Sequence, residues 1–322
     1  MTDGEKPPAT PRSAPLPALS TMWAVQPRFE RDMPAFLDRA AELGYEAVEI
    51  NHGMDAAQAG AILASGTLPV TGVHAPAPLE KHPSAGWNRG MNLAATDGRE
   101  RSLIVGYTRR SIELAAQAGA GVVVVHLGGA GARMLRGERR LRGLFDRGEQ
   151  GTMAWTNAVQ QAREEREAQA APYLEQAARS MAELAETASA HGVAIGLETR
   201  LHYHEIPLPR EARELLAPYP VEVAGYLHDV GHAEVHHRLG LTDLDEWWDE
   251  LGDRLVGLHL QDVRGITDHR APGNGDVDLA ALARRIEAAN PSAARTFEID
   301  QHEPDEDVAS GLQLLREAGV VG

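Results

Sequence analysis

The chain has 322 residues, of which 43% are hydrophobic, and its formal net charge at neutral pH is −16. The apolar content is enough for a large buried core and excludes a largely disordered chain, while the acidic balance argues against nonspecific binding to nucleic-acid phosphates. The sequence contains no cysteine, which excludes disulfides, thiolate metal ligands and cysteine nucleophiles, and it contains 14 histidines.

The first 20 residues, MTDGEKPPATPRSAPLPALS, contain five prolines and no periodic apolar face. We predict a flexible, proline-rich arm over residues 1–20 that can be deleted without loss of stability. The arm does not resemble a signal peptide, and no apolar run in the chain approaches the roughly 18–20 residues of a membrane span. We therefore expect a cytoplasmic protein that has no membrane partner.

Eight short apolar segments rich in β-branched residues follow, and a helical pattern separates each from the next. They cover residues 21–26, 45–50, 68–74, 121–129, 192–200, 223–232, 255–262 and 295–300. Eight strand–helix units of this kind predict a single (β/α)8 TIM-barrel domain over residues 21–322. The alternative is a doubly wound open sheet, although the first segment lacks the glycine-rich phosphate loop that such a sheet would more naturally carry.

One segment, residues 130–171, is too long for an ordinary connection between the fourth strand and its helix. It is highly charged and contains six arginines between Arg133 and Arg147. We predict a solvated helical insertion, followed by a separate barrel helix that ends at Gly192. The alternative is a lid over the barrel mouth that brings arginine to an anionic substrate.

Six consecutive predicted strands end in histidine, glutamate or aspartate. These residues are His74, His126, Glu198, Asp229 with His232 just beyond it, His259 with His269 in the following loop, and Glu298. Active sites of barrel enzymes lie at the carboxyl ends of the strands, and the alternation of side chains directs these residues into the mouth. Clustered buried carboxylates need a countercharge, so we predict a divalent metal site built from imidazole and carboxylate ligands.

The motifs VHAP, VVVVHLGG, GLETR, HDVGH, GLHLQD, DHRAPGNGDVD and FEID resemble those of the xylose isomerase-like TIM-barrel superfamily, over about residues 21–320. That superfamily includes sugar and sugar-phosphate isomerases and epimerases, and also endonuclease IV. The resemblance implies that Glu198, Asp229, His259 and Glu298 are the common metal ligands. It also implies that His232 contacts substrate or binds a further metal.

Three more histidines, His74, His126 and His269, match additional ligands of the trinuclear site of endonuclease IV. That site also uses an aspartate two residues before the last histidine, where this chain has Thr267, with Asp268 displaced by one position. Imidazole and carboxylate ligands without thiolate suit Zn²⁺, Mn²⁺, Co²⁺ or Fe²⁺, and of these we expect Zn²⁺ or Mn²⁺, with one to three ions per chain. We expect two ions and an empty or partial third site.

Two activities use such a metal site. The first is isomerisation or epimerisation of a sugar, polyol or sugar phosphate by proton transfer next to a metal-bound carbonyl. The resemblance implies that Glu198 and Glu298 are its acid and base, and the same site could support a dehydratase or lyase reaction. The second is hydrolysis of a phosphoester by two or three metals.

The loops at the mouth are mixed in charge, which argues against DNA as a partner. A barrel without catalytic activity would fill its mouth with apolar side chains.

Substrate contacts are predicted beyond two of the strands. Arg200, Tyr203, His204 and Glu205 follow the fifth strand, and Arg264 follows the seventh. These side chains could hold the hydroxyls or the phosphate of a small carbohydrate-like substrate. The sequence leaves the oligomeric state open, with a homodimer as one alternative.

Overall fold

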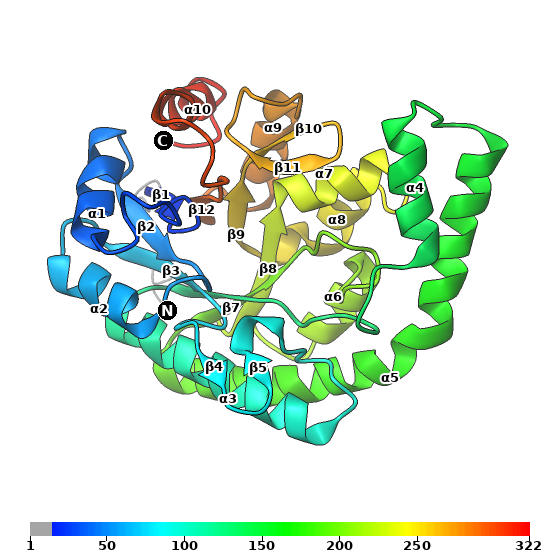
Figure 1. The fold of residues 1–322 in the computed structure, drawn as a ribbon, viewed down its shortest axis with the longest axis horizontal. Coiled ribbons are helices and arrows are strands. Elements are labelled where there is room, and N and C mark those ends of the chain that lie inside the picture. Colours follow the sequence, from blue (N-terminus) through cyan, green and yellow to red (C-terminus); the bar gives the residue numbers. More distant parts are fainter. Residues whose placement is uncertain (1–14) are drawn as a thin grey trace, which may run out of the picture.

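A computed structural model of the chain describes residues 15–322, and it confirms the predicted (β/α)8 TIM barrel (Figure 1). Eight parallel strands close in the order β1-β12-β9-β8-β7-β6-β3-β2. Their bounds are β1 Pro17–Ser20, β2 Ala47–Ile50, β3 Val70–His74, β6 Val122–Val125, β7 Ala194–Glu198, β8 Ala224–Asp229, β9 Leu255–Leu260 and β12 Ala294–Phe297. Two short antiparallel hairpins lie outside the barrel, β4 (Lys81–His82) with β5 (Gly86–Trp87), and β10 (Asp262–Arg264) with β11 (Thr267–Arg270).

Helices surround the barrel, as Figure 1 shows. They are α1 Met33–Glu42, α2 Ala56–Ser65, α3 Gly98–Ala118, α4 Arg136–Asp146, α5 Met153–His191, α6 Pro209–Leu216, α7 Val230–Arg238, α8 Leu244–Leu251, α9 Leu279–Ala289 and α10 Asp305–Glu317. Short 3-10 turns cover Asn88–Gly90 and Gly252–Arg254. Within residues 15–322, no helix combines the length and the apolar character needed to cross a membrane.

The first barrel strand is not where the sequence predicted it. It is formed by Pro17–Ser20, inside the predicted arm, and all four residues are buried, whereas 21–26 forms turns. Residues 21–26 form no strand, and their Trp23 is buried against Phe29 and Phe36. The arm predicted for residues 1–20 is therefore wrong for residues 17–20, and residues 1–14 lie outside the described part of the chain.

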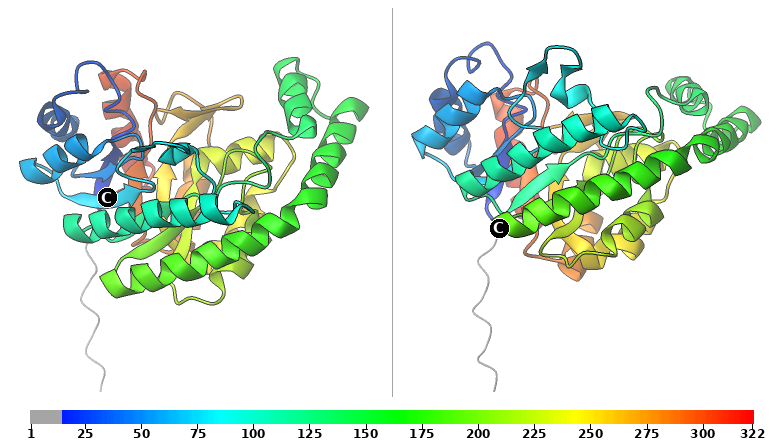
Figure 2. Two further views of the ribbon diagram at one scale, coloured as in Figure 1. Left: turned by 60° about the horizontal axis from the view of Figure 1, so that its bottom comes forward. Right: turned by 90° about the horizontal axis from the view of Figure 1, so that it is seen from below.

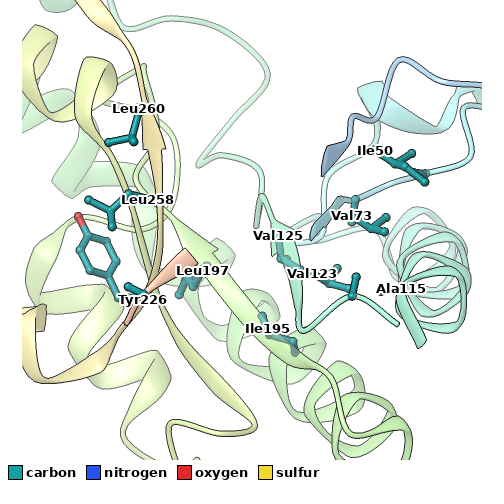
Figure 3. Close-up of a cluster of buried hydrophobic side chains, with 14 of the residues drawn as sticks. Ile50, Val73, Ala115, Val123, Val125, Ile195, Leu197, Tyr226, Leu258 and Leu260 are labelled. Atoms are coloured by element: carbon teal, nitrogen blue, oxygen red, sulfur yellow. The ribbon is translucent and has the colours of Figure 1, made fainter. Parts of the chain in front are cut away.

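Side chains alternate between the two faces of each strand. Apolar side chains point outward to the helices, and polar ones point into the mouth of the barrel. Figure 3 shows Val123 of β6 beside Ala115 of α3, in the layer between barrel and helices. The opposite face of β7 carries Gly196, where a side chain would come within 3.1 Å of Val122 inside the barrel. Since Glu198 lies two residues further along the same strand, it points to the same interior, as predicted.

The insertion is helical, as predicted, but it does not end before the barrel helix. One continuous helix, α5, runs for 39 residues through Pro172, and α4 packs along its N-terminal half. The two helices project beyond the barrel in Figures 1 and 2. They meet at Gly137, where a side chain would lie 2.3 Å from the backbone of Ala162. The insertion therefore has a packed interior of its own rather than being a solvated excursion.

Candidate metal centre

All eight predicted metal ligands lie at the mouth of the barrel, at the carboxyl ends of its strands. His74, Glu198 and Asp229 are the last residues of β3, β7 and β8, and Glu298 directly follows β12. All four are buried. Because the strands are parallel, their ends converge on one space. The set is completed by His126, which directly follows β6, and by His232 of α7, His259 of β9 and His269 of β11.

Glu198 directs its two carboxylate oxygens to different histidines. Oε1 lies 2.9 Å from Nδ1 of His259. Oε2 contacts Nε2 of His126 and lies 3.5 Å from Nε2 of His74. A carboxylate in this position can bridge two cations, one beside each oxygen.

The surroundings of His259 fit a divalent cation. Its Nε2 lies 3.3 Å from Oε2 of the buried Glu49, which orients the ring as a carboxylate behind a metal ligand does. Its Nδ1 lies 2.9 Å from Glu298 and 3.6 Å from Asp229, in addition to Glu198. When Nε2 donates its hydrogen to Glu49, the Nδ1 lone pair faces three carboxylates. A cation in that space would neutralise them.

A second group of ligands lies on the β10–β11 side of the mouth. Ligand atoms of Asp229, His232 and His269 come within 4.8 Å of one another. Oδ2 of Asp268 lies 3.5 Å from Nε2 of His232 and 3.1 Å from Nδ1 of His269. The aspartate stands at position 268 rather than at the expected position 267, yet it still reaches this group. It does so because the register of the β10–β11 hairpin is irregular and His269 has a positive φ of 56°. Asp268 thus joins this group of ligands, and the empty or partial third site stays a prediction.

Two polar side chains after β2 belong to the mouth, and the sequence analysis missed them. Asn51 donates from Nδ2 to Oε1 of Glu298 over 3.1 Å. Nδ1 of His52 lies 3.3 Å from Nδ1 of His74. The signal was present in the sequence, because the second strand also ends in polar residues, in the run EINH.

Burial and nearby charges set the protonation of these groups. Burial alone would raise the pKa of Glu298, but His259 holds that pKa well below its usual range. Burial, together with the Arg200 guanidinium, lowers the pKa of His126 to about 3, so its ring is neutral. For His232 the effect of burial is outweighed by Asp229 and other carboxylates, which raise its pKa to about 8. Glu298 is thus ionised, and the neutral ring of His126 can act as a ligand.

The predicted substrate contacts divide into two groups. Arg200 and Glu205 line a cavity of about 390 Å³ above the metal ligands, where Nη2 of Arg200 lies 2.9 Å from Oε1 of Glu205. His204 lines an adjoining cavity. Tyr203 is buried among the apolar residues of the insertion, and Arg264 is exposed on the β10–β11 hairpin. Neither of these two lines the cavities.

The insertion holds the loop that carries those contacts. The buried Glu138 of α4 accepts hydrogen bonds from Nδ1 of His202 over 2.9 Å and from the amide of Tyr203 over 3.0 Å. Arg166 of α5 donates to the carbonyl oxygens of Tyr203 (2.7 Å) and Glu205 (3.1 Å). None of the six insertion arginines considered for a lid lines either cavity. The insertion therefore supports the 200–205 loop and does not bring these arginines to the mouth.

The sequence matches the family model described as xylose isomerase-like TIM barrel over residues 37–318. A comparison with curated proteins finds no match.

Solved structures with the same fold include two sugar epimerases and one epimerase-like protein. A 3-keto-D-glucoside 4-epimerase from E. coli has 16% identity and a TM-score of 0.66, over 94% of this chain and 98% of that chain. A D-tagatose 3-epimerase-like protein has 18% identity and a TM-score of 0.65, over 94% and 96%. The D-psicose 3-epimerase of Clostridium cellulolyticum H10 has 13% identity and a TM-score of 0.64, over 94% and 99%. At these identities the likeness concerns the fold.

Proposed function

The chain belongs to the xylose isomerase-like TIM-barrel family, and we propose that it is a divalent-metal-dependent epimerase or isomerase of a sugar or sugar phosphate. The observation that carries this proposal is the buried set Glu198, Asp229, His259 and Glu298, with the Nδ1 atom of His259 facing all three carboxylates. The names of the structural neighbours, which are sugar epimerases, agree with this choice.

Glu198 and Glu298 are suited to move a proton across one carbon. They come from β7 and β12, which β8 and β9 separate in the barrel, yet each offers a ligand atom within 4.8 Å of the other. One carboxylate removes a proton from one face of the carbon and the other returns a proton to the opposite face. A divalent ion bound by the four residues would polarise the adjacent carbonyl and acidify that C–H bond.

Our proposal includes two ions per chain, Zn²⁺ or Mn²⁺. The second would be held by His74, His126 and Oε2 of Glu198. Imidazole and carboxylate ligands without thiolate suit both metals.

Hydrolysis of a small phosphoester is the second candidate. It is favoured by one observation, the group formed by Asp229, His232, Asp268 and His269 beside the main ligand set. With these residues the mouth offers ligands for a third ion, and several adjacent ions are typical of metal-dependent phosphoesterases.

The two candidates can be separated with one protein preparation. Chelator-treated protein is reloaded with Zn²⁺ or Mn²⁺, and its metal content is measured by elemental analysis. It is then incubated with D-fructose, D-tagatose, D-psicose, L-ribulose and their phosphates, and in parallel with bis-p-nitrophenyl phosphate. We expect conversion of at least one ketose only after metal is restored. Release of p-nitrophenol without conversion of any sugar would favour the phosphoesterase.

A further inference from the structure

A second cavity opens beside the metal ligands and is larger than the first. It measures about 540 Å³, against about 390 Å³ for the cavity above the ligands. We call them the side cavity and the cup. Five residues line both, namely His52, Arg89, His126, Arg200 and Glu205. A ligand in the cup can therefore extend past these residues into the side cavity.

The wall of the side cavity is closely packed. Its loop after β6 contains Gly128, where a side chain would overlap Oδ1 of Asn92, and Gly129, where one would come within 3.0 Å of His204. Asn92 also donates from Nδ2 to the carbonyl oxygen of Gly129 over 2.8 Å. These contacts fix the loop against the segment that precedes α3, so the cavity has a defined shape.

The lining of the side cavity suits a neutral ligand with many hydroxyl groups. Its lining contains two arginines, Arg89 and Arg200, and three acidic residues, Asp97, Glu100 and Glu205, so it carries no excess positive charge for a phosphate. Hydrogen-bonding capacity is also free, since two buried nitrogens, Nε of Arg200 and Nδ1 of His204, have no partner within residues 15–322. Tyr173 of α5 adds an aromatic ring to this polar wall.

We propose that the side cavity binds a second sugar unit, so that the substrate is a ketose-containing disaccharide or glycoside rather than a free monosaccharide. Each cavity falls within the range of about 300–1,000 Å³ that small-molecule sites occupy. The reacting ketose lies in the cup, and its glycosidic partner lies beyond His126 and Arg200. The inference rests on the proposed function, because the ketose must occupy the cup.

Binding measurements test this proposal independently of turnover. Dissociation constants of the metal-loaded protein are measured by calorimetry for D-fructose and for three disaccharides that contain a fructose unit, isomaltulose, lactulose and turanose. We expect at least one disaccharide to bind about tenfold more tightly than D-fructose, the gain expected from one stacked ring and a few hydrogen bonds. Equal or weaker binding of all three disaccharides would overturn the proposal.

Ala132 provides the variant that locates the extra affinity. It is exposed and lines the side cavity but not the cup, so A132W fills only the side cavity, and A132S is the matched control. We expect A132W to remove the tighter binding of the disaccharide, while the dissociation constant of D-fructose stays unchanged.

A Tyr173→Ala and Tyr173→Phe pair tests the aromatic wall in the same way. A disaccharide advantage that survives both A132W and Tyr173→Ala would place the second unit elsewhere. Selective disaccharide binding without turnover of any sugar would contradict the proposed function alone.

Discussion

Glu198 joins two groups of ligands because each of its oxygens faces different side chains. His259 lies beside Oε1, whereas His74 and His126 lie beside Oε2. Nη1 of Arg200 is also 3.4 Å from Oε2. Positive charge at this second oxygen can thus come from a metal ion or from the Arg200 guanidinium. The two possibilities predict different metal contents when His126 is replaced.

Replacing His126 with alanine should remove about one equivalent of metal per chain. The reason is that His126 supplies one of the two imidazoles beside Oε2 of Glu198 within residues 15–322, while the ligands around His259 stay complete. Elemental analysis of the variant and the wild type, reloaded side by side, checks this. His191→Ala is the matched control, since that histidine is exposed at the end of α5. Unchanged metal content in His126→Ala would mean that Arg200 alone neutralises the second oxygen.

The sequence was sufficient to find the residues at the strand ends and insufficient for those that support them. A histidine or acid that ends an apolar strand stands out, but Glu49 and Gln261 look like ordinary polar residues. Gln261 donates to both oxygens of Asp229 over 2.9 Å, which only the closed barrel reveals. Tyr203 was predicted as a substrate contact because it follows β7, yet the path of the loop buries it in the insertion.

At the scale of elements, the insertion α4–α5 acts on the site through the loop that it holds. Glu138 and Arg166 bind the loop from two helices and leave Arg200 and Glu205 at the wall of both cavities. The pKa of Glu138 lies below its usual range although burial opposes this, because His202 and Arg142 face the carboxylate. An ionised, buried Glu138 therefore contributes to the position of the loop.

Glu138→Ala should weaken substrate binding without removing metal. Loss of the carboxylate leaves the amide of Tyr203 buried without its partner, at a cost of about 1–3 kcal/mol, and frees the loop. We expect a higher KM, a smaller fall in kcat and unchanged metal content, with partial recovery in Glu138→Gln. Glu149→Gln, which alters an exposed ion pair of the same insertion, serves as control. A loss of kcat alone, with KM unchanged, would argue against this positioning role.

An ion pair joins the segment before α1 to the start of α10, and its contribution to stability should depend on pH. The hydrogen bond from Arg28 lowers the pKa of Asp305 at the start of α10, and Arg39 of α1 adds a second bond. A carboxyl whose pKa is lower in the folded chain stabilises the fold above its unfolded pKa, and this contribution is lost as the pH falls through the folded value.

Asp305→Asn should therefore lower the free energy of unfolding at pH 7, by about 0.2–1 kcal/mol because solvent screens the pair. The difference from wild type should shrink below about pH 4. Urea unfolding over a pH series measures both effects, with the exposed Asp38 replaced by asparagine as control. A difference that persists unchanged at low pH would show that the effect is not ionic.

At the scale of the whole molecule, the barrel closes through its shortest strands. β1 lies between β12 and β2, with Ala18 opposite Thr296 on one side and Ala47 on the other. Without β1, two strand edges would be exposed and the parallel sheet would be open.

A chain that begins at Thr21 should therefore lose its cooperative thermal transition or aggregate, when compared with a chain that begins at Pro15. Circular dichroism during heating, together with size-exclusion chromatography, measures this. The same melting temperature for both chains would show that β1 is dispensable, as the arm predicted from the sequence had implied.

Most of the fold could be predicted because strands buried on both faces leave long apolar runs. β1 could not, since PALS is short and begins with proline, while the more apolar MWAV next to it fills a loop with Trp23. The continuity of α5 was also hidden, because Pro172 suggests a helix boundary. In the structure the helix runs through Pro172 without a break.

The central claim is that Glu198 and Glu298 exchange a proton with a carbon next to a sugar carbonyl. The most direct measurement is proton NMR of metal-loaded protein in D₂O with the ketoses and ketose disaccharides named above. The account predicts that deuterium enters at that carbon in substrate and epimer, and that Glu198→Gln and Glu298→Gln each slow this exchange by about a hundredfold or more while retaining the fold. Exchange that is absent from every sugar, or that continues at the wild-type rate in Glu198→Gln, would contradict it.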